Sequence, residues 1–283
     1  MGRPQSLAPN PYKEVPFMEM CKAGKIQYLK PRLGAQGAVA GFTTRHEGVS
    51  RPPYNSLNLG SNTLDSSHNV EGNRSLLARS VGATLDHFLT VTQVHGTDLL
   101  VIDAPNSELS HFLKLECDGI VTNQPGICIA VCIADCVPVL LHDPVQRVVA
   151  ALHAGWQGTA ANIAGKGVEA MVTLFGCDKK DILAAIGPSI SGCCYEVDRP
   201  VRDAFKKAGM AWDLVAKEHA EGKWMLDLAA ANRLLLSDAG LSASQVQGTE
   251  FCVSCNQELF FSYRRDGGDT GRQVGFIMLE EQQ

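Results

Sequence analysis

Short apolar segments rich in valine and isoleucine follow one another through the middle of the chain. Apolar and polar residues hardly alternate within them, which is typical of strands that are covered on both faces. We therefore predict that these segments form a central, buried sheet. They span residues 119–122, 127–134, 137–142 and 148–153.

Helical spacing of apolar residues alternates with further strand-like segments in the rest of the chain. The predicted helices lie at 70–81, 158–175, 201–207 and 226–238, and the predicted strands at 38–45, 182–186, 260–263 and 273–279. Thr159 is the expected N-cap of the second helix. This mixed order favours an α+β fold, a single domain of layered mixed sheets with flanking helices. We place this domain at residues 26–283, after a flexible leader at residues 1–25.

Two connections are unusual enough to guide the search for a site. Residues 88–94 and 99–103 have the composition of strands and flank a Gly-Thr-Asp turn, so we expect a hairpin with His95 at its end. Residues 48–62 form a loop rich in Gly, Pro, Asn and Ser that is longer than an ordinary connection. Long ordered loops are often functional, although a mobile surface loop would have the same composition.

The composition describes a globular protein whose partner is a small molecule. The chain carries a net charge of −5 and has no block of Lys and Arg, so we expect binding neither to nucleic acid nor to an anionic membrane. The longest apolar run, residues 126–141, is interrupted by Asp135 and Pro138 and is shorter than the ~20 residues of a membrane helix. Ten cysteines without a signal-like apolar start predict a reducing, cytoplasmic location.

Three soft-metal ligands are the strongest chemical signal in the sequence. His95, Cys136 and His153 each lie in a turn or at a strand end beside glycine or aspartate. Zinc binds one thiolate and two imidazoles tetrahedrally, and three protein ligands would leave its fourth position open, as in catalytic sites. No short zinc motif joins the three residues, so a buried thiol with two core histidines is the alternative.

Other residues carry chemistry that such a site could use. Asp118 is a candidate general base at the start of a strand, or else part of a turn-forming Asp-Gly pair. Arg45 and the pair Arg264-Arg265 can bind phosphate or carboxylate bidentately, although surface ion pairs would explain them equally well. The helix start that follows His153 can present backbone amides to an anion, although a simple strand-to-helix turn is the commoner explanation.

Two cysteine pairs form a separate motif. Cys252 and Cys255 make a C-x-x-C, and the adjacent Cys193 and Cys194 could complete a structural zinc site or a redox pair with them. A single C-x-x-C is a weak signal, and packed thiols are its default interpretation. The sequence therefore leaves the role of Cys252 and Cys255 open.

The motifs taken together resemble a known bacterial family. This is the multicopper polyphenol oxidoreductase or laccase-domain family, also described as purine nucleoside phosphorylases with adenosine deaminase activity. The blocks that carry the resemblance are Gly41-Phe42-Thr43-Thr44-Arg45, Ser56-Leu57-Asn58-Leu59-Gly60 after Tyr54, Asn73-Arg74, Gln93-Val94-His95-Gly96, Cys117-Asp118-Gly119, Asp135-Cys136-Val137-Pro138, His153-Ala154-Gly155-Trp156, Gly187-Pro188, Cys194-Tyr195-Glu196-Val197 and Phe261-Ser262-Tyr263-Arg264-Arg265-Asp266. They follow one another in order over most of the chain.

The resemblance implies a set of site residues. It implies that the metal is held by His95, Cys136 and His153, the three ligands already singled out by their chemistry. With Asp118 these three form the implied catalytic set. The substrate-binding residues that we assign alongside it are Gln93, Arg264 and Arg45, the last of these on phosphate. This chain departs from the usual family pattern at Glu47-Gly48, where a Gly-Gly pair is common, and at Gln157, where an arginine is common.

The resemblance also implies an activity. It predicts a zinc-dependent purine nucleoside phosphorylase, acting on adenosine, inosine or methylthioadenosine, that also deaminates adenosine. Its partners are then a nucleoside and phosphate, and a homodimer is an open possibility. Copper could replace zinc, since the affinity order of divalent metals permits it.

Two other activities remain as alternatives. The family's fold resembles that of a toxin hydrolase with a Cys-His site, in which Cys136 would be the nucleophile and His153 its base, acting on amide bonds of cell-wall peptides. A copper-dependent phenol oxidase is the activity that the laccase label names. Multicopper oxidation needs clusters built from repeated His-x-His pairs, whereas this chain has eight histidines and no such pair.

Overall fold

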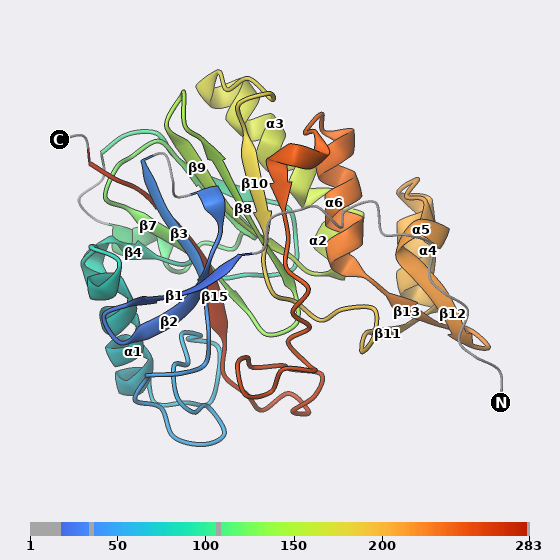
Figure 1. The fold of residues 1–283 in the computed structure, drawn as a ribbon, viewed down its shortest axis with the longest axis horizontal. Helices are drawn as coiled ribbons and strands as arrows, with labels where there is room; N and C mark the ends of the chain where they lie inside the picture. The colour runs from blue at the N-terminus through green and yellow to red at the C-terminus, as the bar shows by residue number, and fades with distance from the viewer. Residues whose placement is uncertain (1–17, 34–36, 106–108, 282–283) are drawn as a thin grey trace.

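Two six-stranded sheets pack against each other at the centre of the protein (Figure 1). The computed structural model describes residues 18–33, 37–105 and 109–281. In the first sheet the strands follow the order β1 (Glu19–Ala23), β2 (Ile26–Lys30), β3 (Ala38–Thr43), β15 (Gln273–Leu279), β7 (Cys128–Ile133) and β4 (Phe88–Leu89). In the second they follow the order β14 (Val246–Gln247), β10 (Leu183–Ile186), β8 (Val137–Asp143), β9 (Val148–Ala154), β6 (Gly119–Thr122) and β5 (Leu99–Ile102).

Apolar side chains from both sheets meet in one core. Ile129 and Ile277 of the first sheet belong to the same buried cluster as Leu140 and Ala151 of the second. Alternate residues on the same strands of the second sheet, such as Leu152, point the other way into a cluster shared with helices. Strands β8 and β9 are therefore buried on both faces, which explains why their sequences do not alternate.

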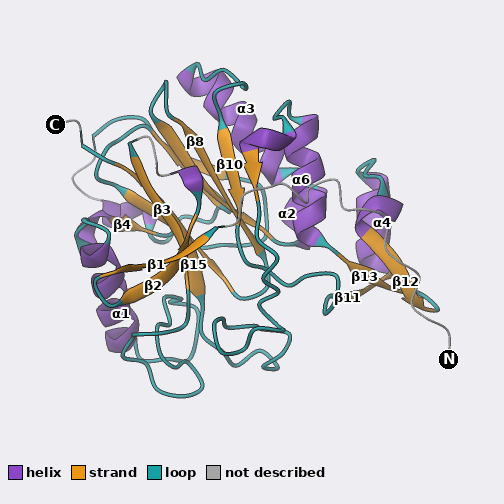
Figure 2. Ribbon diagram, viewed as in Figure 1, coloured by secondary structure: helices purple, strands orange, loops and turns teal. Residues whose placement is uncertain are grey.

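Helices cover the two outer faces and complete a four-layered structure (Figure 2). One helix packs on the first sheet, and the others lie on the second or beyond it. The helices are α1 (Ser67–Ser80) on the first sheet, then α2 (Trp156–Ala160), α3 (Ile163–Phe175) and α6 (Leu228–Asp238) on the second. Short 3-10 helices occur at Leu85–His87, Leu109–Phe112 and Ala243–Gln245. None of the helices in the described ranges is long and apolar enough to cross a membrane.

A small third sheet extends the molecule on the side of the second sheet (Figure 1). Its strands are β11 (Glu196–Asp198), β13 (Lys223–Leu226) and β12 (Ala216–Ala220), and it carries α4 (Arg199–Lys207) and α5 (Trp212–Val215). Phe205, Trp212 and Trp224 stack edge to face where these elements meet. Trp224 also belongs to the cluster under the second sheet, so this extension shares the main core.

The predicted α+β class and most predicted elements are confirmed, but the hairpin around His95 is wrong. Strand β4 pairs with β7 in the first sheet and β5 pairs with β6 in the second, and both pairings are parallel. The chain between them crosses from one sheet to the other. The four segments predicted as one central sheet are likewise divided, since β7 lies in the first sheet and β6, β8 and β9 in the second.

Four smaller predictions also need correction. The helix predicted at 158–175 is two helices, because Asn162 adopts a left-handed conformation with φ of 63° and caps α3 through its side chain. Thr159 lies buried inside α2 instead and accepts a hydrogen bond from Asn232. Residues 260–263 form no strand. Residues 1–17 of the predicted leader lie outside the described residues, but Glu19–Ala23 is strand β1, so the folded domain starts before residue 26.

Candidate metal centre and its cavity

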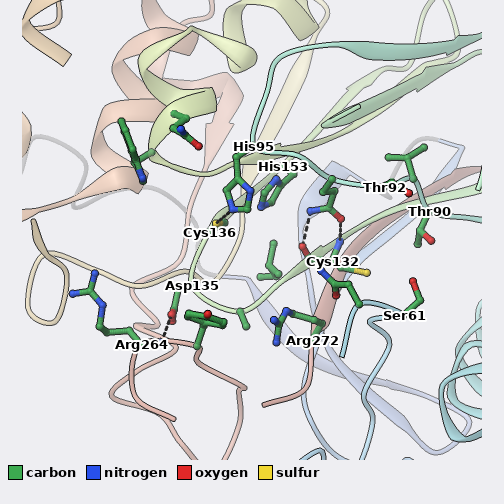
Figure 3. Close-up of a pocket in the computed structure, with 18 of the residues that line it drawn as sticks. Ser61, Thr90, Thr92, His95, Cys132, Asp135, Cys136, His153, Arg264 and Arg272 are labelled. Carbon is green, nitrogen blue, oxygen red and sulfur yellow. Dashed lines mark hydrogen bonds between the residues drawn. The ribbon is translucent and has the colours of Figure 1, made fainter. Parts of the chain in front are cut away.

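His95, Cys136 and His153 come together at one end of the sheets (Figure 3). Their ligand atoms all lie within 4.8 Å of one another. Sγ of Cys136 is 3.8 Å from Nε2 of His95, and the two imidazole rings meet edge to face with centroids 4.9 Å apart. The three residues that the sequence predicts as ligands therefore form one cluster.

The cluster forms where the chain passes between the sheets. His95 lies on the crossing from β4 to β5, and Cys136 lies in the tight connection from β7 to β8. Both connections need left-handed backbone, at His95 with φ of 61° and at Asp135 with φ of 105°. Such conformations are costly for residues other than glycine, so the surrounding structure must hold them in place.

Asp118 holds the His95 connection. Its carboxylate is buried and accepts hydrogen bonds from the backbone N–H groups of Val94, His95 and Gly96 at 3.2, 2.9 and 2.6 Å. It also lies 2.7 Å from Nδ1 of His153. Burial opposes ionisation of Asp118, but the bond and charge of His153 and the backbone amides lower its pKa below the ordinary value. The group is thus an ionised acceptor.

Asp135 holds the Cys136 connection in the same way. Its side chain is buried and accepts a hydrogen bond of 2.6 Å from the hydroxyl of Ser262 and another of 2.6 Å from the backbone N–H of Arg264. Its own carbonyl accepts the N–H of Ile190. The turn that presents Cys136 is therefore tied to the two loops that follow β10 and precede β15.

Cys136 and His153 strongly shift each other's pKa. Burial opposes ionisation of Cys136, but the charge of His153 and hydrogen bonds from both histidines lower the pKa of the thiol to about 6. Burial also disfavours the charged form of His153, yet the Cys136 thiolate and Asp118 raise its pKa to about 9. Without a metal, the two groups are a thiolate and an imidazolium near neutral pH.

The donor set fits zinc. One soft thiolate and two imidazoles are the ligands that zinc prefers, and they converge from three separate segments. The Asp118 contact leaves Nε2 of His153 directed at the cluster, as carboxylates commonly do for metal-binding histidines. A fourth protein ligand is absent from the group that the described residues form, so a substrate or water position stays open.

A cavity of about 680 Å³ opens beside the cluster. Its walls combine aromatic, cationic and small polar side chains. They are Ser61, Asn62, Arg74, Thr90, Val91, Thr92, Gln93, His95, Cys132, Ile133, Ala134, Asp135, Cys136, His153, Trp156, Gln157, Tyr195, Tyr263, Arg264 and Arg272. Aromatic faces beside arginine side chains suit a flat ring joined to an anionic group.

The structure places the predicted substrate-binding and catalytic residues in different positions relative to the cavity. Gln93 lines the cavity, but its side-chain amide is bonded to the backbone N–H and C=O of Cys132 at 2.7 and 2.8 Å. Arg264 lines the cavity over the ring of Tyr195 and donates to the carbonyl of Glu196. Asp118, the candidate general base, lies behind His153 outside the cavity lining. Its geometry is that of a positioning residue.

Arg45, the predicted phosphate ligand, is not among the residues that line the cavity. Its guanidinium donates to the carbonyls of Asn55 and Gln257 at 2.8 and 3.0 Å and stacks on the ring of Phe261. It thus fastens the long loop to the segment before β15. The reason lies in the side-chain direction at the end of β3, which the sequence does not specify.

Arg74 and Arg272 are cavity residues that the sequence analysis did not assign. Arg74 projects from α1 and donates to the carbonyl of Leu59 at 2.9 Å, while Arg272 donates to the carbonyls of Thr270 and Gly271. The only available signal was the Asn73-Arg74 block. Its Asn73 binds Val49, Ser50, Ser56 and Asn58 and so orders the 48–62 loop.

The fold and the site define a layered α+β protein with a His-Cys-His cluster that could hold a metal ion at the wall of a cavity. A family model described as multi-copper polyphenol oxidoreductase laccase matches residues 39–280, and the chain belongs to this family. It is 38% identical to "Purine nucleoside phosphorylase YlmD" of Bacillus subtilis, over 86% of this chain and 89% of the relative. It is also 38% identical to "Adenosine deaminase RL5" of an unknown prokaryotic organism, over 89% and 97%.

A solved structure has the same fold. The crystal structure of YlmD from Geobacillus stearothermophilus superposes with a TM-score of 0.86 at 37% sequence identity, covering 94% of this chain and all of that chain. The resemblance drawn from the sequence blocks is therefore confirmed. Curated members of the family are named as nucleoside-processing enzymes, which places this chain in a family of enzymes.

Proposed function

We propose that this enzyme cleaves purine nucleosides with phosphate and deaminates adenosine, using zinc held by His95, Cys136 and His153. Adenosine, inosine and methylthioadenosine are the proposed nucleosides. The observation that carries the proposal is a single cavity in which an open metal centre, aromatic rings and arginine side chains face one another. The names of the relatives from Bacillus subtilis and the unknown prokaryote support it.

Zinc bound there would act as a Lewis acid and could polarise water or a substrate oxygen. The protein's own groups have separate tasks. Asp118 keeps the Nδ1 proton on His153, so that Nε2 faces the metal position. Trp156, Tyr195 and Tyr263 offer apolar faces on which a purine or ribose can pack while water is displaced.

Arg74 and Arg272 are the proposed phosphate ligands, in place of Arg45. Both guanidinium groups line the cavity, and both are anchored by backbone carbonyls, so that little side-chain freedom is lost on binding an anion. Their charge would offset the repulsion that phosphate meets as it approaches the sugar carbon. The predictions of a cytoplasmic location and of a homodimer stay predictions.

A second candidate is favoured by one observation. Cys136, His153 and Asp118 are connected in the order of a thiol hydrolase triad, and the thiol has a lowered pKa. Zinc and acyl transfer would compete for the same sulfur, because a coordinated thiolate is a poor nucleophile. The copper oxidase alternative finds less support, since the metal-binding groups among the described residues include just two histidines, His95 and His153.

The test combines metal analysis with a phosphate-dependent assay on the three nucleosides. Wild-type protein should contain about one zinc per chain more than a His95→Ala variant, and base release should require phosphate and stop when zinc is removed. Restoring zinc should restore the activity. Chelator-resistant base release, or none from zinc-loaded protein, would contradict the proposal. Hydrolysis of an amide by metal-free protein would favour the thiol hydrolase.

A further inference from the structure

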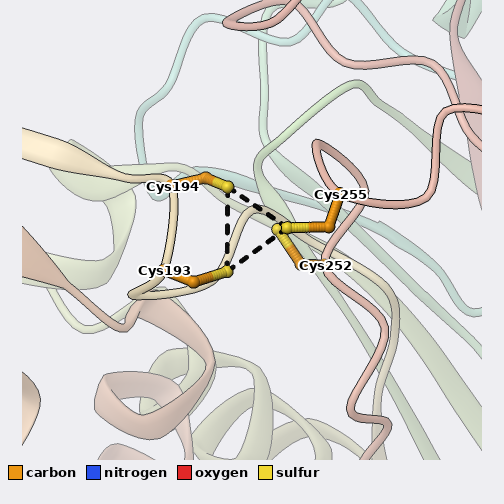
Figure 4. A group of neighbouring side chains, drawn as sticks. All are labelled: Cys193, Cys194, Cys252 and Cys255. Carbon is orange, nitrogen blue, oxygen red and sulfur yellow. Dashed lines mark hydrogen bonds between the residues drawn. The ribbon is translucent and has the colours of Figure 1, made fainter. Parts of the chain in front are cut away.

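Four cysteines converge at a second place, away from the cavity (Figure 4). They are Cys193, Cys194, Cys252 and Cys255, and their sulfur atoms all lie within 4.8 Å of one another. The Sγ atom of Cys255 is 3.3 Å from that of Cys194 and 3.6 Å from that of Cys193. The two adjacent cysteines have sulfurs 3.7 Å apart.

These separations match the edges of a metal tetrathiolate. Zinc–sulfur bonds of ~2.3 Å in a regular tetrahedron place the sulfurs ~3.8 Å apart. A disulfide would require a separation of ~2.05 Å, and closing one would use only two of the four sulfurs. Four sulfurs that approach one another from two loops thus resemble the ligand shell of a single ion.

Neighbouring groups hold Cys252 and the C-x-x-C turn in place. The buried Sγ of Cys252 accepts the backbone N–H of Ser191 at 3.5 Å, as sulfur ligands of metal centres commonly do. Arg265 donates to the carbonyls of Val253 and Ser254 within the C-x-x-C turn at 2.8 and 3.5 Å. The guanidinium is itself paired with the Asp266 carboxylate at 2.7 and 2.8 Å, so Arg265 orders the turn that presents Cys252 and Cys255.

The four cysteines connect two loops that build the cavity wall. Cys193 and Cys194 precede Tyr195, and Cys252 and Cys255 lie in the loop that continues to Arg264. Tyr195 and Arg264 both line the cavity. The loops already touch through backbone, since the N–H of Val253 donates to the carbonyl of Ser189 at 3.0 Å. None of the four cysteines is a cavity residue, so an ion there would be structural.

We propose that Cys193, Cys194, Cys252 and Cys255 bind one zinc ion in a closed tetrathiolate site that joins the loop after β10 to the loop before β15. Binding replaces four S–H protons by four Zn–S bonds, and the four protons pass to solvent. No electron transfer takes place. With four protein ligands the ion has no open position, which distinguishes this site from the His-Cys-His centre.

The experiment counts zinc in the full-length protein. Wild-type protein should hold about two zinc ions per chain, and both Cys252→Ser/Cys255→Ser and His95→Ala should hold about one. Cys21→Ser, which changes a cysteine on β1, should leave the count unchanged. Equal zinc in wild type and Cys252→Ser/Cys255→Ser would overturn the proposal, as would iron in place of zinc.

A second measurement avoids dependence on variant folding. Cobalt loaded into His95→Ala protein should give the charge-transfer absorption of a tetrathiolate. This tetrathiolate signal should be lost in the double variant His95→Ala/Cys194→Ser. In wild type, the four cysteines should resist alkylation until a chelator removes zinc, as mapped by peptide mass. Alkylation of all four in zinc-loaded protein, or a disulfide between any two, would overturn the site.

Discussion

Nδ1 of His153 and Oδ1 of Asp118 lie 2.7 Å apart, and both side chains are buried. The same carboxylate accepts three backbone N–H groups around His95. One aspartate therefore sets the tautomer of one proposed metal ligand and the backbone conformation of another. Because both effects act on ligand geometry, Asp118 should control metal affinity more than any step of proton transfer.

We expect Asp118→Asn to weaken zinc binding by roughly 10- to 100-fold, the usual effect of removing an outer-shell partner. The amide keeps the size of the side chain but loses the negative charge that favours a protonated Nδ1. Competition with a chelator of known affinity measures the change. At saturating zinc, most of the activity should return. Activity that stays low at full zinc occupancy would instead make Asp118 a direct participant in catalysis.

A second prediction concerns the glycine beside the His-Cys-His cluster. A Cβ atom on Gly155 would lie 2.7 Å from Cδ2 of His95 and 3.3 Å from Sγ of Cys136. Gly155→Ala should therefore displace a ligand and lower zinc affinity, although alanine is otherwise acceptable at a helix start. Gly72→Ala is the matched control, because its Cβ would meet only Val49 at 3.5 Å.

The two alanine variants should have opposite effects. Gly155→Ala should lower zinc affinity, whereas Gly72→Ala should leave it unchanged and raise the free energy of unfolding. Gly72 lies inside α1, where alanine stabilises a helix by ~1 kcal/mol relative to glycine. Denaturant unfolding and zinc titration of both proteins measure the contrast. Zinc affinity equal in Gly155→Ala and wild type would show that the ligands can shift without loss.

The arginine assignments give a third prediction. Arg74→Met should raise the KM for phosphate by roughly 10- to 100-fold, since a charged hydrogen bond contributes ~1.5–3 kcal/mol. Arg45→Met should leave that KM unchanged and instead lower the free energy of unfolding by ~1–3 kcal/mol, because two carbonyls and the Phe261 ring lose their partner. Phosphate-dependent kinetics and urea unfolding separate the two. The reverse pattern would restore Arg45 as a phosphate ligand.

The strands were predictable where burial dictated their composition. Residues 137–142 and 148–153 are apolar throughout because both faces of β8 and β9 are covered, so the sequence indicates strands there. Because these strands are uniformly apolar, their sequences do not indicate which of the two sheets each strand joins. The Gly-Thr-Asp turn after His95 suggested a hairpin, but the pairing of β4 with the distant β7 overrides that local signal.

The clustering of the proposed metal ligands was predictable, whereas the cavity walls were not. His95, Cys136 and His153 are soft-metal donors beside glycine or aspartate, and the blocks that carry the family resemblance contain all three. An arginine such as Arg45, Arg74 or Arg272 serves equally well as a carbonyl anchor or an anion ligand. The direction of its side chain depends on contacts between distant segments, and only the folded structure supplies them.

The ionisation of Cys136 gives a fourth prediction. With zinc removed, the thiol pKa is about 6 against an ordinary value of 9.0, so the reactive thiolate forms as pH rises through 6. Alkylation of Cys136 should therefore reach half of its plateau near pH 6 and stay level to pH 8. In unfolded protein the rate should keep rising up to about pH 9. Peptide mapping after short exposure to iodoacetamide gives the profile of this one cysteine.

Zinc should abolish this reactivity, because coordination occupies the sulfur that alkylation needs. His153→Gln should raise the midpoint, since the positive charge that stabilises the thiolate is lost. Rapid alkylation in zinc-loaded protein would show that Cys136 is free and would favour the thiol hydrolase. A midpoint near pH 9 in metal-free folded protein would show that His153 does not carry the positive charge, and the paired thiolate and imidazolium would then be absent.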